Sequence, residues 1–109
     1  MTIEINCPHL KIEESFLKSM EKELLELSHL NKDISRAEVF FREDESQPAD
    51  NKICEIRLTV FSDNLYARRV SENFYLSARE VMDELKTRVL RQVELGKEPP
   101  EETTSTVDV

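Results

Sequence analysis

The sequence predicts one α+β domain, residues 1–97, in which two helices cover one face of a four-stranded mixed sheet. The apolar residues recur with the period of a strand, then of a helix, then of three strands and a second helix, which gives the order β-α-β-β-β-α. Gly occurs once and Pro four times, so few positions interrupt regular structure. Each helical segment has one apolar stripe, and each of the two longest strands has one apolar face. The simplest burial of these surfaces places both helices on the same side of the sheet.

The first two elements are a short strand and a long helix. Residues 2–7 alternate Ile3 and Ile5 with polar side chains, as in a half-buried strand, and Pro8 ends this pattern. From residue 12 to about residue 30 the apolar residues recur at steps of three and four, which predicts an amphipathic helix. This stripe consists of Ile12, Phe16, Met20, Leu24 and Leu27.

Three strands follow, each with alternating apolar and polar residues. Their expected ranges are 34–42, 52–61 and 65–70. The polar segment 43–51 predicts a hairpin loop, and residues 62–64 (Ser-Asp-Asn) predict a tight turn. The side chains expected on the face of the sheet away from the helices are Arg36, Glu38, Phe40, Arg42, Glu55, Arg57 and Thr59.

The second helix is expected from Ser71 to about Leu95. Ser71 has the hydroxyl that an N-cap needs, Gly96 fits the C′ stop position, and the two prolines that follow prevent continuation. Residues 98–109 are rich in Glu, Thr and Ser and are predicted to form a disordered acidic tail. The three consecutive strands should form an antiparallel meander. The first strand should lie parallel to the second at the edge of the sheet, through a right-handed crossover.

The formal net charge is −8, and the acidity is concentrated in two segments. Residues 43–51 and the tail after Lys97 hold eight acids and no base. The rest of the chain holds 15 acids and 15 bases, so the folded body is expected to be neutral. Because a neutral body has no general attraction for polyphosphate, nucleic-acid binding would need a local basic patch.

The sequence contains no motif that indicates catalysis. A single Gly cannot build a phosphate-binding loop, and His9 and His29 lack partners at metal-ligand spacing. His9 is expected to be a hydrogen-bonded corner residue or a contact residue. Cys7 and Cys54 are expected to be buried free thiols in a reducing cytoplasm, and no signal peptide or membrane-spanning run is present. We therefore expect a cytoplasmic protein that is not an enzyme and has no cofactor or metal.

Two groups of residues resemble the sequence pattern of a known family. The first group is Ile3-Glu4-Ile5, His9-Leu10 and the apolar frame Phe16, Met20, Leu24 and Leu27. The second group is Glu72-Asn73-Phe74-Tyr75, Asp83-Glu84-Leu85 and Arg88. In their order and spacing, over residues 2–93, the chain resembles the ribosome hibernation promoting factors, also named ribosome-associated inhibitors or sigma-54 modulation proteins.

The resemblance implies a fold like that of double-stranded-RNA-binding domains. It also implies a protein that sits in the decoding channel of the small ribosomal subunit, blocks the tRNA and mRNA sites and keeps ribosomes idle under stress. Family members contact rRNA phosphates through Lys and Arg on the sheet and on both helices. Long members add a C-terminal dimerisation domain, whereas this chain has only a short acidic tail and resembles the short class. The rRNA-binding residues implied here are Arg36, Arg42, Arg57, Arg68, Arg69, Arg79, Arg88 and Arg91.

The chain departs from the family pattern at several basic positions. Glu23 and Glu26 stand where the family tends to have Lys, and Glu84 replaces the Lys of an Asp-Lys-Leu string. The basic run near the end of the second helix is reduced to Arg88 and Arg91. Each phosphate contact that is lost lowers the logarithmic salt slope of binding by about 0.9.

Two functions follow from these observations. The first is binding to the small ribosomal subunit, with repression of translation. The second is a diverged protein-interaction module that kept the fold and lost the rRNA site. Its partner would be another protein, or a second copy, bound through Phe40 and Phe61 on the open sheet face.

Overall fold

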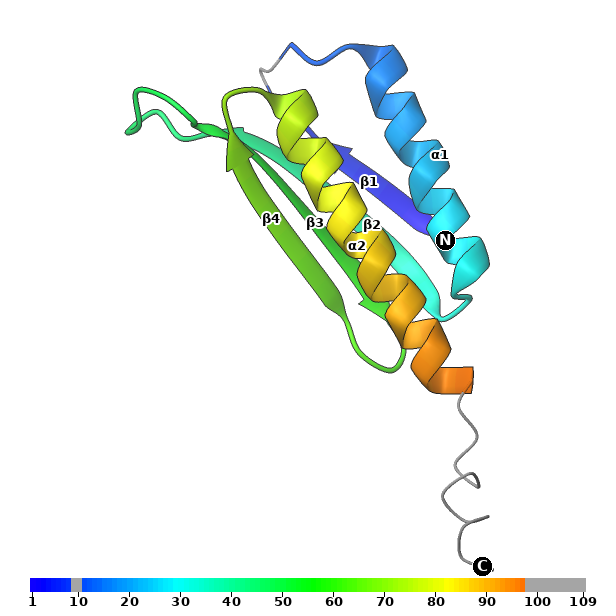
Figure 1. The fold of residues 1–109 in the computed structure, drawn as a ribbon. Coiled ribbons are helices and arrows are strands. Elements are labelled where there is room, and N and C mark those ends of the chain that lie inside the picture. Colours follow the sequence, from blue (N-terminus) through cyan, green and yellow to red (C-terminus); the bar gives the residue numbers. More distant parts are fainter. Residues whose placement is uncertain (9–10, 98–109) are drawn as a thin grey trace, which may run out of the picture.

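The structure is a computed structural model that describes residues 1–8 and 11–97. It contains six elements in the predicted order (Figure 1). Their bounds are β1 Thr2–Asn6, α1 Glu14–Leu30, β2 Ile34–Glu43, β3 Lys52–Val60, β4 Leu65–Ser71 and α2 Phe74–Lys97. The predicted tail, residues 98–109, and the corner residue His9 lie outside the described residues.

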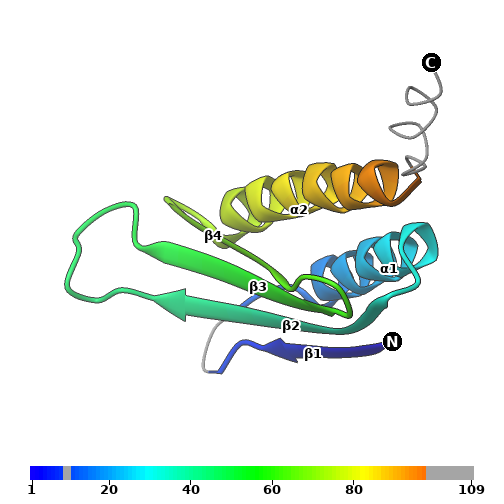
Figure 2. The same cartoon turned by 90° about the horizontal axis from the view of Figure 1, so that it is seen from below.

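The four strands form one mixed sheet in the order β1-β2-β3-β4. β1 pairs parallel with β2, and the two remaining pairs are antiparallel, as predicted. Figure 2 shows both helices on one side of the sheet, which leaves the opposite side uncovered. The α+β fold class predicted from the sequence is therefore confirmed.

The core lies between the sheet and the two helices. The alternation in β2 buries Ala37, Val39 and Phe41, which lie opposite Leu58, Ile56 and Cys54 of β3. Each helix contributes one apolar stripe, although Ile12 of the predicted first stripe precedes α1. The buried members of the two stripes are Met20, Leu24, Leu27, Ala78, Val81, Met82, Leu85 and Val89.

The ends of α2 differ from the prediction. The helix begins at Phe74, and the Leu76 N–H donates to the Asn73 side-chain oxygen at 2.7 Å, so Asn73 does the capping expected of Ser71. Ser71 ends β4 instead, and its buried hydroxyl lies 2.6 Å from that of Ser77. The expected stop at Gly96 is also wrong, because the helix continues to Lys97 and Gly96 does not have a positive φ.

The two thiols have different environments. Cys54 is fully buried in β3, and this burial raises its pKa to about 12. Cys7 lies just after β1 and is only half-buried, so the prediction of two buried thiols is wrong for Cys7. Cys7 still packs against the core, and like Ile3 and Ile5 it is only half-buried because β1 is an edge strand of the sheet.

Candidate nucleic-acid interface

We call the side of the sheet away from the helices the open face. The strand register places Arg57 of β3 between Glu38 of β2 and Tyr66 of β4. In the next row, Glu55 of β3 lies between Phe40 of β2 and Arg68 of β4. These rows form the centre of the open face, and all the members predicted from β2 and β3 alternation lie on it.

Arg57 lies within reach of two aromatic rings. Its guanidinium carbon is 5.7 Å from the centre of the Phe40 ring and 5.8 Å from the centre of the Tyr66 ring. Both distances are in the range of a favourable cation–π contact. Among the residues that the structure describes, Arg57 forms no ion pair with a carboxylate. Its charge is therefore available to a partner.

Glu55 joins the two rows of the open face. Its carboxylate accepts hydrogen bonds from the Tyr66 hydroxyl and from the Arg42 guanidinium, and the residue is only 8% exposed. Burial by itself would raise the pKa of Glu55. The two hydrogen bonds and the charges of Arg42 and Arg68 outweigh it, so the pKa lies below its ordinary value. The same bond to Glu55 raises the pKa of Tyr66. Glu55 is thus a structural anion that fixes the ring of Tyr66.

Arg68 lies where the open face meets the β2–β3 hairpin. It lines a hollow with Arg42, Ile53 and the three acidic residues that begin the hairpin, Glu43, Asp44 and Glu45. None of these carboxylates lies within ion-pair distance of Arg68 in residues 1–8 and 11–97. The hairpin itself is closed by the Asp44 N–H, which donates to the Asn51 carbonyl at 2.9 Å. Hydrogen bonds from Ser46 lower the pKa of Asp44, and the charges of Arg68 and Arg42 add to this effect.

The remaining arginine of the open face is neutralised. Arg36 donates to the Glu4 carboxylate on β1 and lies 3.4 Å from a Glu38 oxygen. A phosphate would have to compete with these two carboxylates for the Arg36 guanidinium. Of the four arginines predicted on this face or next to it, Arg57 and Arg68 are therefore the best placed for an anionic ligand.

On the helix side, three predicted residues form one cluster at the β4 edge. Glu84 of α2 lies 2.5 Å from Arg69 and 3.4 Å from Arg88, the second being the i,i+4 pair. Arg88 also donates to the Tyr66 carbonyl at 2.7 Å. Because β4 is an edge strand, this bond occupies a backbone group that would otherwise be open to another strand. Arg69 and Arg88 are thus engaged within the domain.

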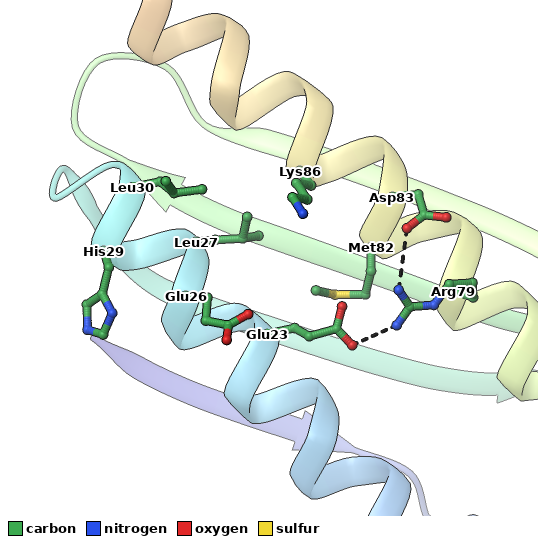
Figure 3. A pocket seen from close by; sticks show the side chains of 9 residues that line it. All are labelled: Glu23, Glu26, Leu27, His29, Leu30, Arg79, Met82, Asp83 and Lys86. Carbon is green, nitrogen blue, oxygen red and sulfur yellow. Dashed lines mark hydrogen bonds and ion pairs between the residues drawn. The ribbon is translucent and has the colours of Figure 1, made fainter.

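Arg79 bridges the two helices. It lies 2.6 Å from Glu23 of α1 and 3.4 Å from Asp83 of α2, and the Glu23 hydrogen bond raises its pKa (Figure 3). These three residues line a groove of about 340 Å³ between α1 and α2. Glu26 and Lys86 line the same groove, which therefore holds three carboxylates and two bases. Because Arg79 is already paired with two of these carboxylates, the groove is unfavourable for a phosphate.

The helices and the open face differ in their balance of charged residues. The helices α1 and α2 contain eight acids and seven bases. The open face contains four arginines against three carboxylates, one of which is the buried Glu55. Arg91 is exposed on α2 and, like Arg57, has no carboxylate partner within the described ranges.

Two exposed aromatic side chains lie near the β3–β4 turn or on β4. Phe61 is 89% exposed and directly follows the end of β3, in the turn before β4. Tyr66 was not identified from the sequence. It is 43% exposed and lies directly opposite Arg57. The alternation of β4 could have indicated it, because Leu65 and Ala67 on either side of it are both buried.

Two further findings concern other classes of site. No group of three or more His, Cys, Asp or Glu side chains placed to hold a metal ion occurs in residues 1–8 and 11–97. In the same part of the chain, no helix has both the length and the apolar character needed to cross a bilayer.

A four-stranded sheet with arginine and aromatic side chains on its open face is typical of α+β domains that bind RNA. The comparison with known families is more specific. The chain belongs to the family described as sigma 54 modulation protein / S30EA ribosomal protein, which it matches over residues 3–95. This confirms the resemblance found in the sequence.

Solved structures show the same fold. A ribosomal subunit interface protein from Coxiella burnetii superposes with a TM-score of 0.69 at 18% identity, covering 84% of this chain and 97% of that one. The N-terminal domain of Protein Y from Thermus thermophilus superposes with a TM-score of 0.63 at 18% identity, covering 83% and 93%. No curated protein sequence matches the chain. At this identity, the likeness establishes the fold.

Proposed function

We propose that this chain binds the small ribosomal subunit through rRNA and represses translation, as a cytoplasmic, non-enzymatic factor of the hibernation type. Membership of a ribosomal protein family supports binding to a ribosome. The names of its structural neighbours, a ribosomal subunit interface protein and Protein Y, agree with this proposal. The observation that carries our choice of surface is that Arg57 and Arg68 both lie on the open face without a carboxylate partner among the described residues.

The open face suits rRNA for a second reason. The chain as a whole has a net charge of −8, which repels a polyanion at long range, and the folded body outside residues 43–51 and the tail is neutral. Binding would then depend on local arginines that are not ion-paired, and Arg57 and Arg68 meet this condition among the described residues. The other predicted contacts, from Arg36, Arg69, Arg79 and Arg88, would have to exchange a carboxylate for a phosphate, so we assign them a secondary part.

The test is sedimentation of the purified protein with isolated small subunits over a salt series. We expect pelleting that weakens steeply between about 50 and 200 mM salt, as for any interface that releases counterions. The double variant Arg57→Ala/Arg68→Ala should lower the logarithmic salt slope by about 1.4–1.8, which corresponds to two phosphate contacts.

The matched control is Lys18→Ala/Lys22→Ala, which removes the same charge from an exposed face of α1. Its salt slope should stay near that of the unchanged protein. Equal losses from the two double variants would mean that binding depends on total charge, and would contradict the open face as the site. Inhibition of translation in a purified system, measured with the same variants, tests the repression.

A second function is favoured by one observation. Five of the eight predicted contact arginines are paired with carboxylates, which is the arrangement expected of a domain that no longer binds RNA. In that case the chain would be a protein-interaction module. This function predicts no pelleting with small subunits even at low salt, and a defined dimer or hetero-complex in solution.

A further inference from the structure

We propose that the Phe40–Arg57–Tyr66 cluster of the open face is a stacking platform for an unpaired RNA base. This inference rests on the proposed function and specifies the form of RNA that the site takes. The three side chains come from three adjacent strands, and the Arg57 guanidinium lies within 6 Å of both rings. The guanidinium and the rings are planar π-systems on which a base can stack.

The platform is held in place before any ligand binds. The Tyr66 hydroxyl donates to the buried carboxylate of Glu55, two residues along the neighbouring strand from Arg57. This bond draws the ring across the sheet toward Glu55, and a ring tethered at both ends loses little conformational freedom on binding. Such preorganisation lowers the entropy cost of association.

The surroundings of the cluster fit the edge of a base. A shallow hollow of about 520 Å³ adjoins Arg57 and Tyr66, and its polar lining comes from Glu38, Thr59 and Asn64. The Asn64 oxygen accepts a bond from the Val60 N–H at 2.9 Å, which leaves the Asn64 amide N–H groups for a ligand. Donors and acceptors at the rim can thus hydrogen-bond an exposed base edge while the rings hold its face.

A phosphate site lies at the right distance from this hollow. Arg68 is two residues from Tyr66 on the same face of β4, which is about 7 Å along the strand. A nucleotide whose base lies on Tyr66 can therefore direct a phosphate toward Arg68. A duplex cannot use this arrangement, because its bases are stacked on each other and are covered by the backbone. The geometry favours a splayed single strand, as found in rRNA loops and at helix ends.

The experiment measures the binding of a short single-stranded RNA and of the same sequence as a duplex, by fluorescence anisotropy. The informative pair of variants is Tyr66→Phe and Tyr66→Leu. Both remove the bond to Glu55, and only the second removes the ring. We expect Tyr66→Leu to weaken single-strand binding about 5- to 150-fold relative to Tyr66→Phe, which is the range found for loss of one stacked base. Binding of the duplex should be weaker than that of the single strand, with little difference between the variants.

Two further measurements separate stacking from charge. Arg57→Lys keeps the charge, so the salt slope should be unchanged while affinity for the single strand falls several-fold, because a lysine has no planar group. Replacing the nucleotides by abasic ones should abolish the difference between Tyr66→Leu and Tyr66→Phe. Circular dichroism and thermal melts should confirm that each variant folds.

The platform is overturned if Tyr66→Leu and Tyr66→Phe bind the single strand equally, or if duplex and single strand bind equally well. Sedimentation with small subunits distinguishes this result from a failure of the proposed function. Intact pelleting together with equal binding by the two Tyr66 variants refutes the platform alone. Absence of pelleting by the unchanged protein, at any salt, refutes the proposed function.

Discussion

Replacement of Glu55 by Gln tests whether the centre of the open face is built on a charged carboxylate. Glu55 is 8% exposed and accepts bonds from Arg42 and Tyr66. Gln has the same shape as Glu but is neutral. Its amide oxygen can accept one of the two bonds, whereas its NH2 group, itself a donor, would face the other donor. The protein should still fold, because the residues of the main core lie on the other side of the sheet.

The expected loss follows from the bonds that are weakened. A hydrogen bond to a charged group contributes about 1.5–3 kcal/mol, and Gln can replace one of the two bonds with a weaker neutral one. We therefore expect the free energy of unfolding to fall by about 2 kcal/mol. For a domain of this size that corresponds to a fall of about 8–16 °C in Tm.

The pH dependence gives the sign of the effect. The pKa of Glu55 is lower in the folded protein than its ordinary value of 4.5, so folding favours the charged form. Its stabilisation is therefore complete above the unfolded pKa and is lost as the pH falls through the folded pKa. Urea unfolding at about pH 7 should show the full difference between the two proteins, and the difference should shrink as the pH falls below 4.5 and through the folded pKa of Glu55.

Urea unfolding of Tyr66→Phe and of the double variant Glu55→Gln/Tyr66→Phe gives the coupling energy between Glu55 and Tyr66. A difference in stability that is the same at neutral and acid pH would refute the reasoning, since a neutral partner would then serve as well as the carboxylate.

Three further predictions concern the core, the buried thiol and the acidic helix side. Leu24→Ala, at a fully buried position, should lower stability by about 2–5 kcal/mol, whereas Leu25→Ala next to it, at a 43% exposed position, should cost far less; similar losses in urea unfolding would contradict the assigned faces of α1. Iodoacetamide should modify Cys7 in the native protein and spare Cys54, whose pKa is raised to about 12, while both react in urea; mass spectrometry decides, and equal native rates would contradict the burial of Cys54. Glu84→Gln should release Arg69 and Arg88 and steepen the salt slope of RNA binding by up to about 1.8, and an unchanged slope would show that the bound RNA does not reach the β4 edge.

The fold could be predicted from the sequence because its long elements have clear periods. Val39 and Phe41 alternate with polar residues, and Met20 and Leu24 recur at helical steps, so burial alone decides their orientation. The start of α2 could not be predicted as well. Ser71 and Asn73 are both good N-caps, and only the length of β4, which uses Ser71 to pair with Lys52, decides between them.

The candidate site was predictable in part. Strand alternation placed Arg57 and Arg42 on the open face. The ion pair of Glu84 with Arg88 has an i,i+4 spacing, which a sequence can indicate. The pairs between distant elements were not predictable in this way. Arg79 meets Glu23 across 56 positions of sequence, and no local pattern indicates which carboxylate a guanidinium will reach when two helices pack together.

The ion pairs between distant elements matter because a charge count from the sequence treats every arginine alike. In the folded domain, Glu23 and Glu84 form ion pairs with three arginines on the helix side of the sheet. These two glutamates therefore do more than lower the net charge, since each also removes the basic groups around it from contact with a ligand. On the open face, by contrast, the main carboxylate is Glu55, which is directed to Arg42 and Tyr66 and leaves Arg57 and Arg68 unpaired within the described residues. An acidic protein can in this way keep one positive surface, and the RNA that binds there would be selected by the rings beside the charge rather than by charge alone.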